Sequence, residues 1–494
     1  MKSFLIFVLI SSVVFSQSIH QTESEFYKIN KKNIPRIKHP SAAINKVNND
    51  TPELNRMVFG FLPWWEKVSG DYASIRYDLL SHLGVFSFET DSMGNLSIPP
   101  DSTWPWNTVF NNAIDNHVKL VMTITNFNTD AVHRLLSDIG VRSTLFNNIK
   151  NYLVTVGFSG VIIDFENVSA GDDRQFAYKN FVRLLREELD KYNPNWEIGA
   201  ALPPIDSGQW DFAGIADYCN YIFVMCYNYY GRWSSTTGPS SPLTGGYNNI
   251  TTAFIEDYKD VPPEKLIMGV PYYGNKWETS SGELYISVSP YDTSNQYNNW
   301  QSSPYYKDII PDFYTVERIW DQSSQTPMMR WPINATTWLQ VWYDDSSSIA
   351  KKYDLAIQKN LGGVGMWALG YDDGRSELWN LIQDKFTVKT NIANGIKEIP
   401  YEYRLEQNYP NPFNPSTVIR FQIPTVDELS PVETHVTLIV YDVLGREIAT
   451  LVNEEKAPGN YEVKFNGHNL SGGIYFYTLH TGNFIQSKKM ILLK

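Results

Sequence analysis

Eight short apolar segments recur between residues 57 and 368, and they constrain the fold of this chain more than any other feature. Each is followed by a turn and usually by a stretch long enough for a helix, which is the connection that parallel strands require. Eight such strands close a β/α barrel, whereas a doubly wound open sheet, the alternative, usually has fewer. The predicted strands are Met57–Trp65, Leu83–Glu89, Val118–Phe127, Gly160–Asn167, Ile198–Leu202, Tyr221–Tyr229, Leu266–Tyr273 and Val364–Ala368.

The connection between the seventh and eighth predicted strands, about residues 275–335, is longer than any simple loop. It is rich in tryptophan and tyrosine, which suggests a lobe inserted on the face of the barrel that carries the carboxyl ends of the strands. The predicted fold class is therefore α/β, a (β/α)8 TIM barrel over residues 54–385 with an insertion before the eighth strand.

The segments outside the barrel differ in composition. Met1–Ser16 has one lysine followed by an apolar run, which predicts a secretory signal peptide. Residues 17–53 are polar and weakly periodic, and we interpret them as a leader or linker that wraps the next domain. A polar connector over residues 386–400 precedes residues 401–494, where alternating segments separated by Gly, Pro and Asn turns predict a small all-β sandwich.

Composition excludes several classes of function. The 494 residues include 41 basic and 53 acidic side chains, and a net charge of −12 argues against nucleic acid or an anionic membrane as partner. No segment after the signal peptide is long and apolar enough to span a membrane. The eight histidines show no metal-ligand spacing and no Gly-rich phosphate loop is present, so we expect neither metal nor cofactor. Cys219 and Cys226 are too far apart along an extended segment for a disulfide.

The fourth predicted strand ends in Asp164-Phe165-Glu166, which places two carboxylates on the same side of a buried strand. Two carboxyl groups in one cavity acquire different pKa values, so that one can hold a proton while the other stabilises a cation. A strand end whose acids simply face water is the plainer alternative for this pattern alone. Barrel enzymes place their chemistry at these strand ends, which favours the catalytic interpretation.

Aromatic residues end two other strands. Met225 and Tyr227 alternate on one side of the sixth strand, and Trp367 lies in the eighth. Aromatic rings offer flat apolar faces to sugars, and a tyrosine hydroxyl offers one oriented donor. Each aromatic taken singly is more often a core residue. Their position beside paired carboxylates favours a sugar-binding cleft.

These segments resemble the family 18 glycoside hydrolases, which include chitinases, N-acetylglucosaminidases and chitinase-like lectins. The family's fourth-strand motif, Asp-Gly-x-Asp-x-Asp-x-Glu, corresponds to residues 159–166, where Asp164 and Glu166 are kept but Ser159 and Ile162 replace the first two acids. Met-x-Tyr at 225–227, the segment 266–274 and Gly-Gly-x-x-x-Trp ending at Trp367 follow in the family's order. The phrase Asp-Phe-Glu-Asn-Val at 164–168 is most similar to the spore-cortex and peptidoglycan branch.

The resemblance implies hydrolysis of β-1,4 bonds after N-acetylglucosamine in chitin or peptidoglycan, with retention and without an enzyme nucleophile. Glu166 would protonate the leaving oxygen, Asp164 would orient the substrate's acetamido group, and Tyr227 would donate a hydrogen bond to it. The implied catalytic residues are thus Glu166, Asp164 and Tyr227, and the implied substrate-binding residues are Trp367, Met225, Asn228, Asn126 and Tyr272.

Two departures from the family pattern keep other functions open. Ile162 removes a proton site next to Asp164, and Asn228 stands where an acid usually follows Met-x-Tyr. A non-catalytic carbohydrate-binding lectin is therefore an alternative, although such lectins commonly lose the residue that is Glu166 here. A surface adhesin that displays an inactive barrel is a third, and it leaves the retained Asp164, Glu166 and Tyr227 unexplained.

The last hundred residues resemble the C-terminal sorting domain of the type IX secretion system. The resemblance rests on Tyr-Pro-Asn-Pro-Phe-Asn-Pro at 409–415, on Val-Tyr-Asp-Val-Leu-Gly-Arg at 440–446 and on a basic final strand. It implies the type IX machinery as a partner and a secreted or cell-surface location. A carbohydrate-binding or fibronectin-like module is the alternative, and it lacks this combined set.

Overall fold

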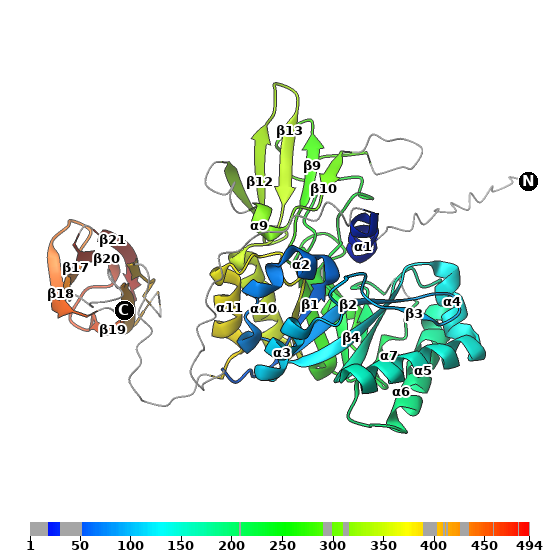
Figure 1. Ribbon diagram of the computed structural model, residues 1–494. Helices are drawn as coiled ribbons and strands as arrows, with labels where there is room; N and C mark the ends of the chain where they lie inside the picture. Colours follow the sequence, from blue (N-terminus) through cyan, green and yellow to red (C-terminus); the bar gives the residue numbers. More distant parts are fainter. Residues whose placement is uncertain are drawn as a thin grey trace, which may run out of the picture. The chain divides into compact units, whose positions relative to one another are not determined.

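The computed structural model describes residues 18–29, 52–206, 209–289, 299–309, 316–388, 403–408, 411, 413–424, 434–457, 459–482 and 484–493. It divides into two compact units, Met1–Lys389 and Thr390–Lys494 (Figure 1). The predicted signal peptide, most of the leader and most of the connector lie outside the described residues.

The first unit is a closed barrel of eight parallel strands, as predicted. Neighbouring strands pair in chain order, and the first strand pairs with both the second and the last, which closes the barrel. A short strand, β3 (Leu96–Ser97), adds to the second strand in antiparallel fashion. The barrel strands are β1 (Met57–Pro63), β2 (His82–Thr90), β4 (Lys119–Asn126), β5 (Gly160–Phe165), β6 (Glu197–Leu202), β7 (Tyr221–Met225), β8 (Leu266–Pro271) and β14 (Gly363–Trp367).

Helices surround the barrel and cover the outer faces of its strands (Figure 1). Strand β5 shows why this arrangement forms, because all six of its residues are buried and such a strand needs packing on both faces. The helices of this layer are α2 (Trp64–Ser69), α3 (Asn107–Asp115), α4 (Thr129–Ser137), α5 (Ile139–Val156), α6 (Tyr178–Asp190), α7 (Phe212–Ala216), α8 (Ile250–Thr252), α10 (Ser346–Gln358) and α11 (Ser376–Phe386).

Local signals fix where the longer helices begin and end. The Asp138 side chain accepts hydrogen bonds from the backbone at the start of α5, and Gly157 ends that helix with a φ of 86°. Asp345 and Ser348 form a reciprocal capping box at the start of α10. The first of these caps separates α4 from α5, and the capping box starts the helix that leads from the inserted sheet back to β14.

An antiparallel sheet is inserted between β8 and β14, which confirms the predicted insertion. Its strand order is β10-β9-β13-β12-β11, and its own small core contains Trp277, Met328 and Trp342. The sheet stands on the barrel and is drawn in green to yellow in Figure 1. Its elements are β9 (Asn275–Thr279), β10 (Trp300–Ser302), α9 (Tyr306–Ile309), β11 (Glu317–Asp321), β12 (Thr326–Pro332) and β13 (Trp338–Trp342).

The second unit consists of two antiparallel sheets that share one hydrophobic core. Phe421, Leu438 and Tyr477 are fully buried in that core, which is separate from the core of the barrel. One sheet contains β15 (Arg404–Leu405), β16 (Ser416–Ile423) and β19 (Gly459–Asn466). The other contains β17 (Thr434–Tyr441), β18 (Glu447–Lys456), β20 (Gly473–Thr481) and β21 (Phe484–Leu492).

One helix lies within the segment that we interpreted as a polar leader. Helix α1 (Ile19–Ile29) packs against the barrel beside the inserted sheet, and Figure 1 draws it in dark blue. It belongs to the first compact unit. None of the described helices combines the length and the apolar composition needed to cross a membrane. Cys219 and Cys226 are both buried and free, as expected.

Candidate active site

Strand β5 brings two carboxylates to the carboxyl end of the barrel. Asp164 is the next-to-last residue of the strand and is fully buried, and Glu166 follows the last residue. Phe165 between them packs on Phe181 of α6, so Asp164 and Glu166 point the other way, into the barrel mouth. Both carboxylates lie 3.0 Å from one atom, the Nδ1 of His20.

Two aromatic side chains complete this cluster. The Tyr227 hydroxyl, just beyond β7, lies 2.9 Å from Nε2 of His20. The Trp367 ring at the end of β14 lies under the imidazole, with ring centroids 3.8 Å apart and planes at 34°. The His20 ring therefore marks a ring-sized space that is walled by Asp164, Glu166 and Tyr227 and floored by Trp367.

Burial and charge set the protonation of this cluster. Burial alone would lower the pKa of His20, but the charges of Asp164 and Glu166 outweigh it and raise that pKa from 6.5 to about 10. Burial raises the pKa of Asp164 above its ordinary 3.8, and His20 opposes this rise. Burial also holds the pKa of Tyr227 well above 10, so its hydroxyl stays neutral. At neutral pH the cluster is an imidazolium held between acids.

Three further predicted residues lie at or just beyond the carboxyl ends of barrel strands. Met225 is partly buried at the end of β7. Asn228 adopts a φ of 62°, and its Oδ1 accepts a 2.7 Å hydrogen bond from the hydroxyl of Tyr273. Asn126 ends β4, where its Nδ2 donates to the carbonyl of Thr90 at 2.6 Å. Asn126 thus holds two strand ends together at the rim of the cleft.

Tyr272, the last predicted binding residue, does not join the cluster. The groups that raise the pKa of its buried hydroxyl are Tyr353, Asp372 and Tyr306, and none of the cluster residues is among them. Because residues alternate along an extended segment, its neighbour Tyr273 faces the site instead, with its ring 6.2 Å from that of Tyr227. Tyr273 therefore replaces Tyr272 among the candidate site residues.

Helix α1 contributes site residues that the sequence reasoning missed. His20, Glu23 and Tyr27 recur at spacings of three and four, which puts them on one face of a helix. That spacing was the available signal, but the segment was interpreted as a leader because it is polar. The structure places this face in the barrel mouth.

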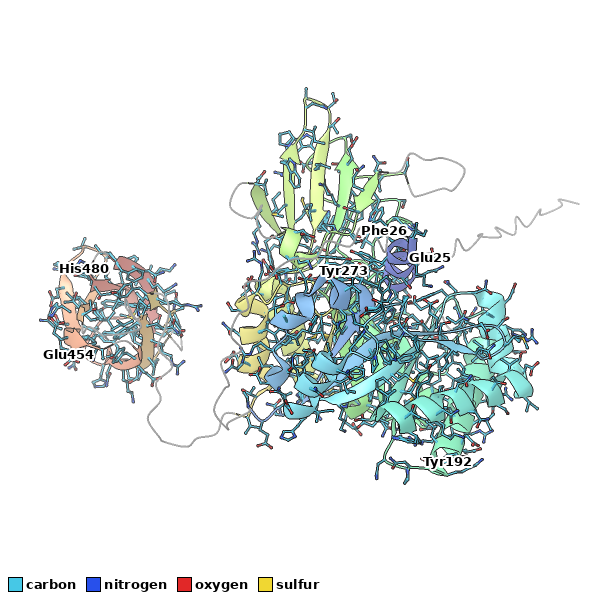
Figure 2. All side chains as sticks on the ribbon, in the orientation of Figure 1. Glu25, Phe26, Tyr192, Tyr273, Glu454 and His480 are labelled. Atoms are coloured by element: carbon cyan, nitrogen blue, oxygen red, sulfur yellow. The ribbon has the colours of Figure 1, made fainter. Side chains whose placement is uncertain are left out.

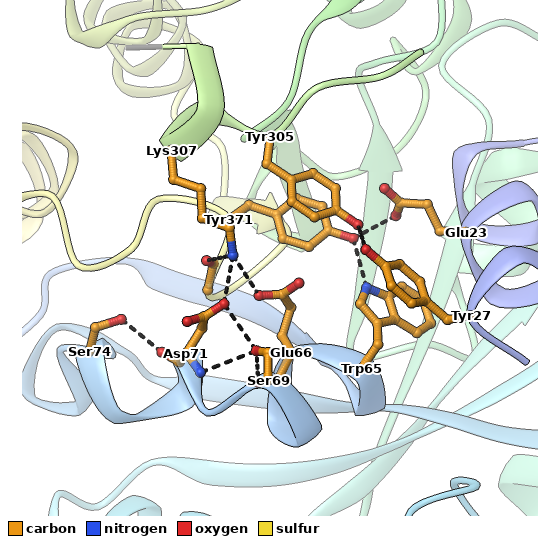
Figure 3. Close-up of polar contacts among 11 residues, drawn as sticks. Glu23, Tyr27, Trp65, Glu66, Ser69, Asp71, Ser74, Tyr305, Lys307 and Tyr371 are labelled. Carbon is orange, nitrogen blue, oxygen red and sulfur yellow. Dashed lines mark hydrogen bonds and ion pairs between the residues drawn. The ribbon is translucent and has the colours of Figure 1, made fainter. Parts of the chain in front are cut away.

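Glu23 and Tyr27 extend the contacts of α1 along the cleft. Glu23 Oε2 accepts a 3.0 Å hydrogen bond from Trp367 Nε1 and a 2.6 Å bond from the Tyr371 hydroxyl. The Tyr27 ring stacks on Trp65, with centroids 5.0 Å apart and planes at 12°, and its hydroxyl lies 2.8 Å from that of Tyr305 (Figure 3). Burial raises the pKa of Glu23 from 4.5 to about 7, although these donors oppose the rise.

The cleft continues on both sides of α1. A hollow of about 290 Å³ lies between the helix and the ends of β2 and β4, lined by Gln21, Glu25, Glu89 and Asn126 among others. A smaller hollow lies between Ile19 and Thr22 of the helix and Trp300 of the inserted sheet. Glu25 and Phe26 occupy the exposed side of α1 (Figure 2). The helix therefore lies in a cleft wider than itself.

The cluster also has the composition of a cation site. Among the residues that the structure describes, His20, Asp164 and Glu166 offer ligand atoms within 4.8 Å of one another. In this structure the same three side chains form the ion pairs described above, with Nδ1 of His20 between the two carboxylates.

Comparisons with known proteins show which families the two units resemble. Residues 42–372 match the model of the glycosyl hydrolases family 18, and residues 407–493 match that of a secretion system C-terminal sorting domain. A Bacillus subtilis protein named as a sporulation-specific glycosylase, YdhD, is 30% identical over 359 residues, which cover 68% of this chain and 78% of YdhD. The cortical fragment-lytic enzyme of the same species is 28% identical over 328 residues, 63% of this chain and 68% of that enzyme.

Two solved structures share the fold. The spore cortex-lytic enzyme SleL of Bacillus megaterium QM B1551 aligns with a TM-score of 0.54 and 24% identity, over 69% of this chain and 76% of SleL. A chitinase from Cycas revoluta, solved in complex with (GlcNAc)3, aligns with a TM-score of 0.57 and 19% identity, over 67% of this chain and 99% of the chitinase. With the match over residues 42–372, the chain belongs to family 18 of the glycosyl hydrolases, and it is a glycoside hydrolase with a C-terminal sorting domain.

Proposed function

We propose that this enzyme cleaves β-1,4 bonds after N-acetylglucosamine in chitin or peptidoglycan, by a retaining mechanism in which the substrate's own acetamido group is the nucleophile. One observation carries the proposal: two carboxylates and a tyrosine hydroxyl converge on a single ring-sized space above Trp367. A sugar that replaced the imidazole of His20 would meet all of these groups at once.

Each residue has a distinct task in the proposed reaction. Glu166 protonates the glycosidic oxygen as the bond to the leaving sugar breaks. The acetamido carbonyl oxygen attacks the anomeric carbon and forms an oxazolinium ion, and Asp164 orients the acetamido nitrogen and stabilises the positive charge. Tyr227 donates a hydrogen bond to the acetamido group, since its hydroxyl stays neutral. Water then opens the oxazolinium ring, with Glu166 as the base.

The test is an assay of soluble products from chitin oligomers and from purified peptidoglycan. Because α1 covers the site, both the full chain and its His20→Ala/Glu23→Ala variant are assayed. We expect sugars with a reducing N-acetylglucosamine end, in the β configuration at first, from at least one polymer. Sugar binding without any product would instead favour the lectin alternative, and an initial α product would contradict retention.

The missing acid at Ile162 gives a prediction about pH. Ile162 is fully buried on the same face of β5 as Asp164, and its register partner Thr123 has a buried hydroxyl without a hydrogen-bond partner among the described residues. Ile162→Asp should move the acidic limb of the activity profile toward higher pH by about one unit, because the second carboxylate of a close pair ionises against the charge of the first.

Ile162→Asn is the matched control for this experiment, since it adds polarity without charge. The pH profiles of both variants are compared with that of the parent after thermal unfolding has shown that they are folded. If the pH profile of Ile162→Asp is superimposable on that of the parent, an acid at position 162 does not couple to Asp164, and the prediction is wrong.

The sorting domain indicates export by the type IX system to the cell surface or beyond. We propose that the chain first crosses the inner membrane by the predicted signal peptide. Deletion of residues 401–494 should then leave a folded barrel in the periplasm, because the two units have separate cores. Cell fractionation followed by immunoblotting measures this, and a truncated protein in the medium at the parent's level would refute the sorting role.

A further inference from the structure

We propose that helix α1 is an autoinhibitory segment of this enzyme, which occupies the sugar-binding cleft and must leave before a polysaccharide can bind. The inhibitory role rests on the function proposed above, because it assumes that the space filled by His20 is the sugar site. It concerns a segment outside the motifs of the barrel strands, and it follows from contacts within the first compact unit.

The first argument is that α1 engages every candidate catalytic group. His20 forms ion pairs with Asp164 and Glu166 through one ring nitrogen and a hydrogen bond with Tyr227 through the other. Its ring covers Trp367, the predicted floor of the site. No sugar can contact these side chains while the imidazole is in place.

The second argument is the chemistry of the buried face. A helix on a protein surface normally buries an apolar stripe, but α1 buries His20, Gln21, Glu23 and Ser24 together with Ile19. Its exposed residues include Phe26, 56% exposed, and Ile29, 84% exposed. The helix is therefore inverted relative to an ordinary packed helix, and its polar face matches a cleft that offers donors, acceptors and aromatic surfaces, as a cleft for sugars does.

The third argument is that the contacts continue beyond the catalytic cluster. Tyr27 stacks on Trp65 as a sugar ring would, and Glu23 accepts hydrogen bonds from Trp367 and Tyr371. At the helix's other edge, Lys28 forms an ion pair with Glu89 at the end of β2. The segment thus follows the cleft for its whole length and blocks more than one sugar position.

Helix α1 owes its structure to the cleft. A helix of 11 residues is marginal in water on its own, so docking and folding of this segment are coupled. The barrel does not need α1 in the same way, because its strands and helices close around a core to which α1 contributes Ile19 at the margin. Release of α1 therefore exposes the site without unfolding the enzyme.

The direct test compares the full-length parent with its His20→Ala/Glu23→Ala variant. The variant removes the side chains of α1 that pair with buried charged and polar groups of the cleft, which weakens docking of the helix. We therefore expect kcat/KM on a chitin oligomer, and affinity for that oligomer, to rise at least about tenfold. Ile29→Ala is the matched control, since it changes the same helix at an exposed position and should leave both values unchanged. Thermal unfolding checks that all three proteins are folded.

Catalysis and binding are measured separately, so the two proposals can fail independently. The sugar-binding measurement uses calorimetry with the chitin oligomer. Equal sugar binding by parent and variant would overturn the inhibitory role of α1 and leave the proposed function standing. Tighter binding by the variant without hydrolysis would overturn the proposed hydrolysis but support the inhibition. No binding by either protein would overturn both.

A second experiment leaves every contact residue unchanged. A protease recognition sequence is placed between residues 30 and 51, and the same sample is measured before and after cleavage. In one chain the effective concentration of α1 is on the order of millimolar, and cleavage followed by dilution removes this advantage. Activity should rise on cleavage to the level of the His20→Ala/Glu23→Ala variant. Gel filtration shows whether the cleaved peptide has separated from the barrel. If it has separated and the activity is unchanged, the proposal is contradicted.

The inhibition should also weaken at alkaline pH. The pKa of His20 is about 10 when α1 is docked, against an ordinary value of 6.5. Between pH 6.5 and 10, docking of α1 therefore takes up a proton. The affinity of α1 for the cleft falls by up to about tenfold for each unit that the pH rises in this range. The pKa of Glu23 is about 7 when α1 is docked, against an ordinary value of 4.5, so docking also weakens as the pH rises between these two values. The other titratable groups that face these two side chains are Asp164, Glu166, Tyr27, Tyr227, Tyr273, Tyr305 and Tyr371.

Burial raises the pKa of Asp164 to about 6, so this carboxylate opposes the trend only as the pH falls toward that value. Burial also keeps the pKa values of the tyrosines above 10. The rise in activity caused by His20→Ala/Glu23→Ala should therefore be smaller at pH 9 than at pH 6.5. A ratio of variant to parent activity that stays constant over this range would contradict the assigned ion pair.

Discussion

We expect replacement of Glu166 by Gln to abolish hydrolysis, with kcat reduced by at least about a hundredfold, while sugar binding survives. Glutamine keeps the shape of the side chain but has no proton to give to the glycosidic oxygen and cannot later act as a base. The measurement is best made in the His20→Ala/Glu23→Ala background, where α1 no longer competes for the site. The two readouts are kcat on a chitin oligomer and affinity for the same oligomer.

Glu187→Gln supplies the matched control, because Glu187 lies on the outer surface of α6 with 55% of its side chain exposed. It should leave hydrolysis unchanged. A Glu166→Gln variant that kept most of its activity would rule out Glu166 as the acid, and one that lost sugar binding as well would point to a structural role.

The second large effect is expected for Asp164→Asn. Asp164 is fully buried beside the space marked by His20, and its proposed task is to hold the acetamido group and stabilise the oxazolinium ion. Asparagine keeps the size but removes the negative charge, so kcat should fall by about a hundredfold, as it does when one preorganised electrostatic group is lost. The loss should appear with little change in affinity for the oligomer.

Substrate choice separates this mechanism from one with an enzyme nucleophile. A β-1,4 glucan without acetamido groups should not be hydrolysed by the parent or by either variant, because it lacks the attacking carbonyl. Asp190→Asn, at the exposed end of α6, is the control for the charge change. Equal parent activity on the unsubstituted glucan would contradict the substrate-assisted mechanism.

Much of the fold was predictable because its signals are local. Each barrel strand is a short apolar run followed by a turn. A strand that is buried on both faces, such as β5, has a nearly continuous apolar sequence. The order of eight such runs left few arrangements, and the closed barrel confirms the prediction. The inserted sheet was predictable as an insertion from its length, but the pairing of β9 with β13 depends on contacts across more than fifty residues.

The candidate site was predictable to the extent that it lies at strand ends. Asp164 and Glu166 share a side because side chains alternate along β5. Tyr227 lies just beyond the end of β7, and Trp367 is the last residue of β14. The choice between Tyr272 and Tyr273 was not available from the sequence. It depends on how the chain leaves β8, and only the packed structure turns Tyr273 toward Asn228.

The sequence by itself determined the barrel, its strand order and the pair of acids at its mouth, because these follow from apolar periodicity and from the alternation of side chains. Only the tertiary structure decided where α1 lies. A polar segment of 11 residues has little helical stability of its own, and its spacing of His20, Glu23 and Tyr27 has no meaning until a partner surface exists. That surface is assembled from the ends of β5, β7 and β14 and the start of α2, which are far apart in the chain, so the covering of the active site by α1 emerges only when the barrel has closed.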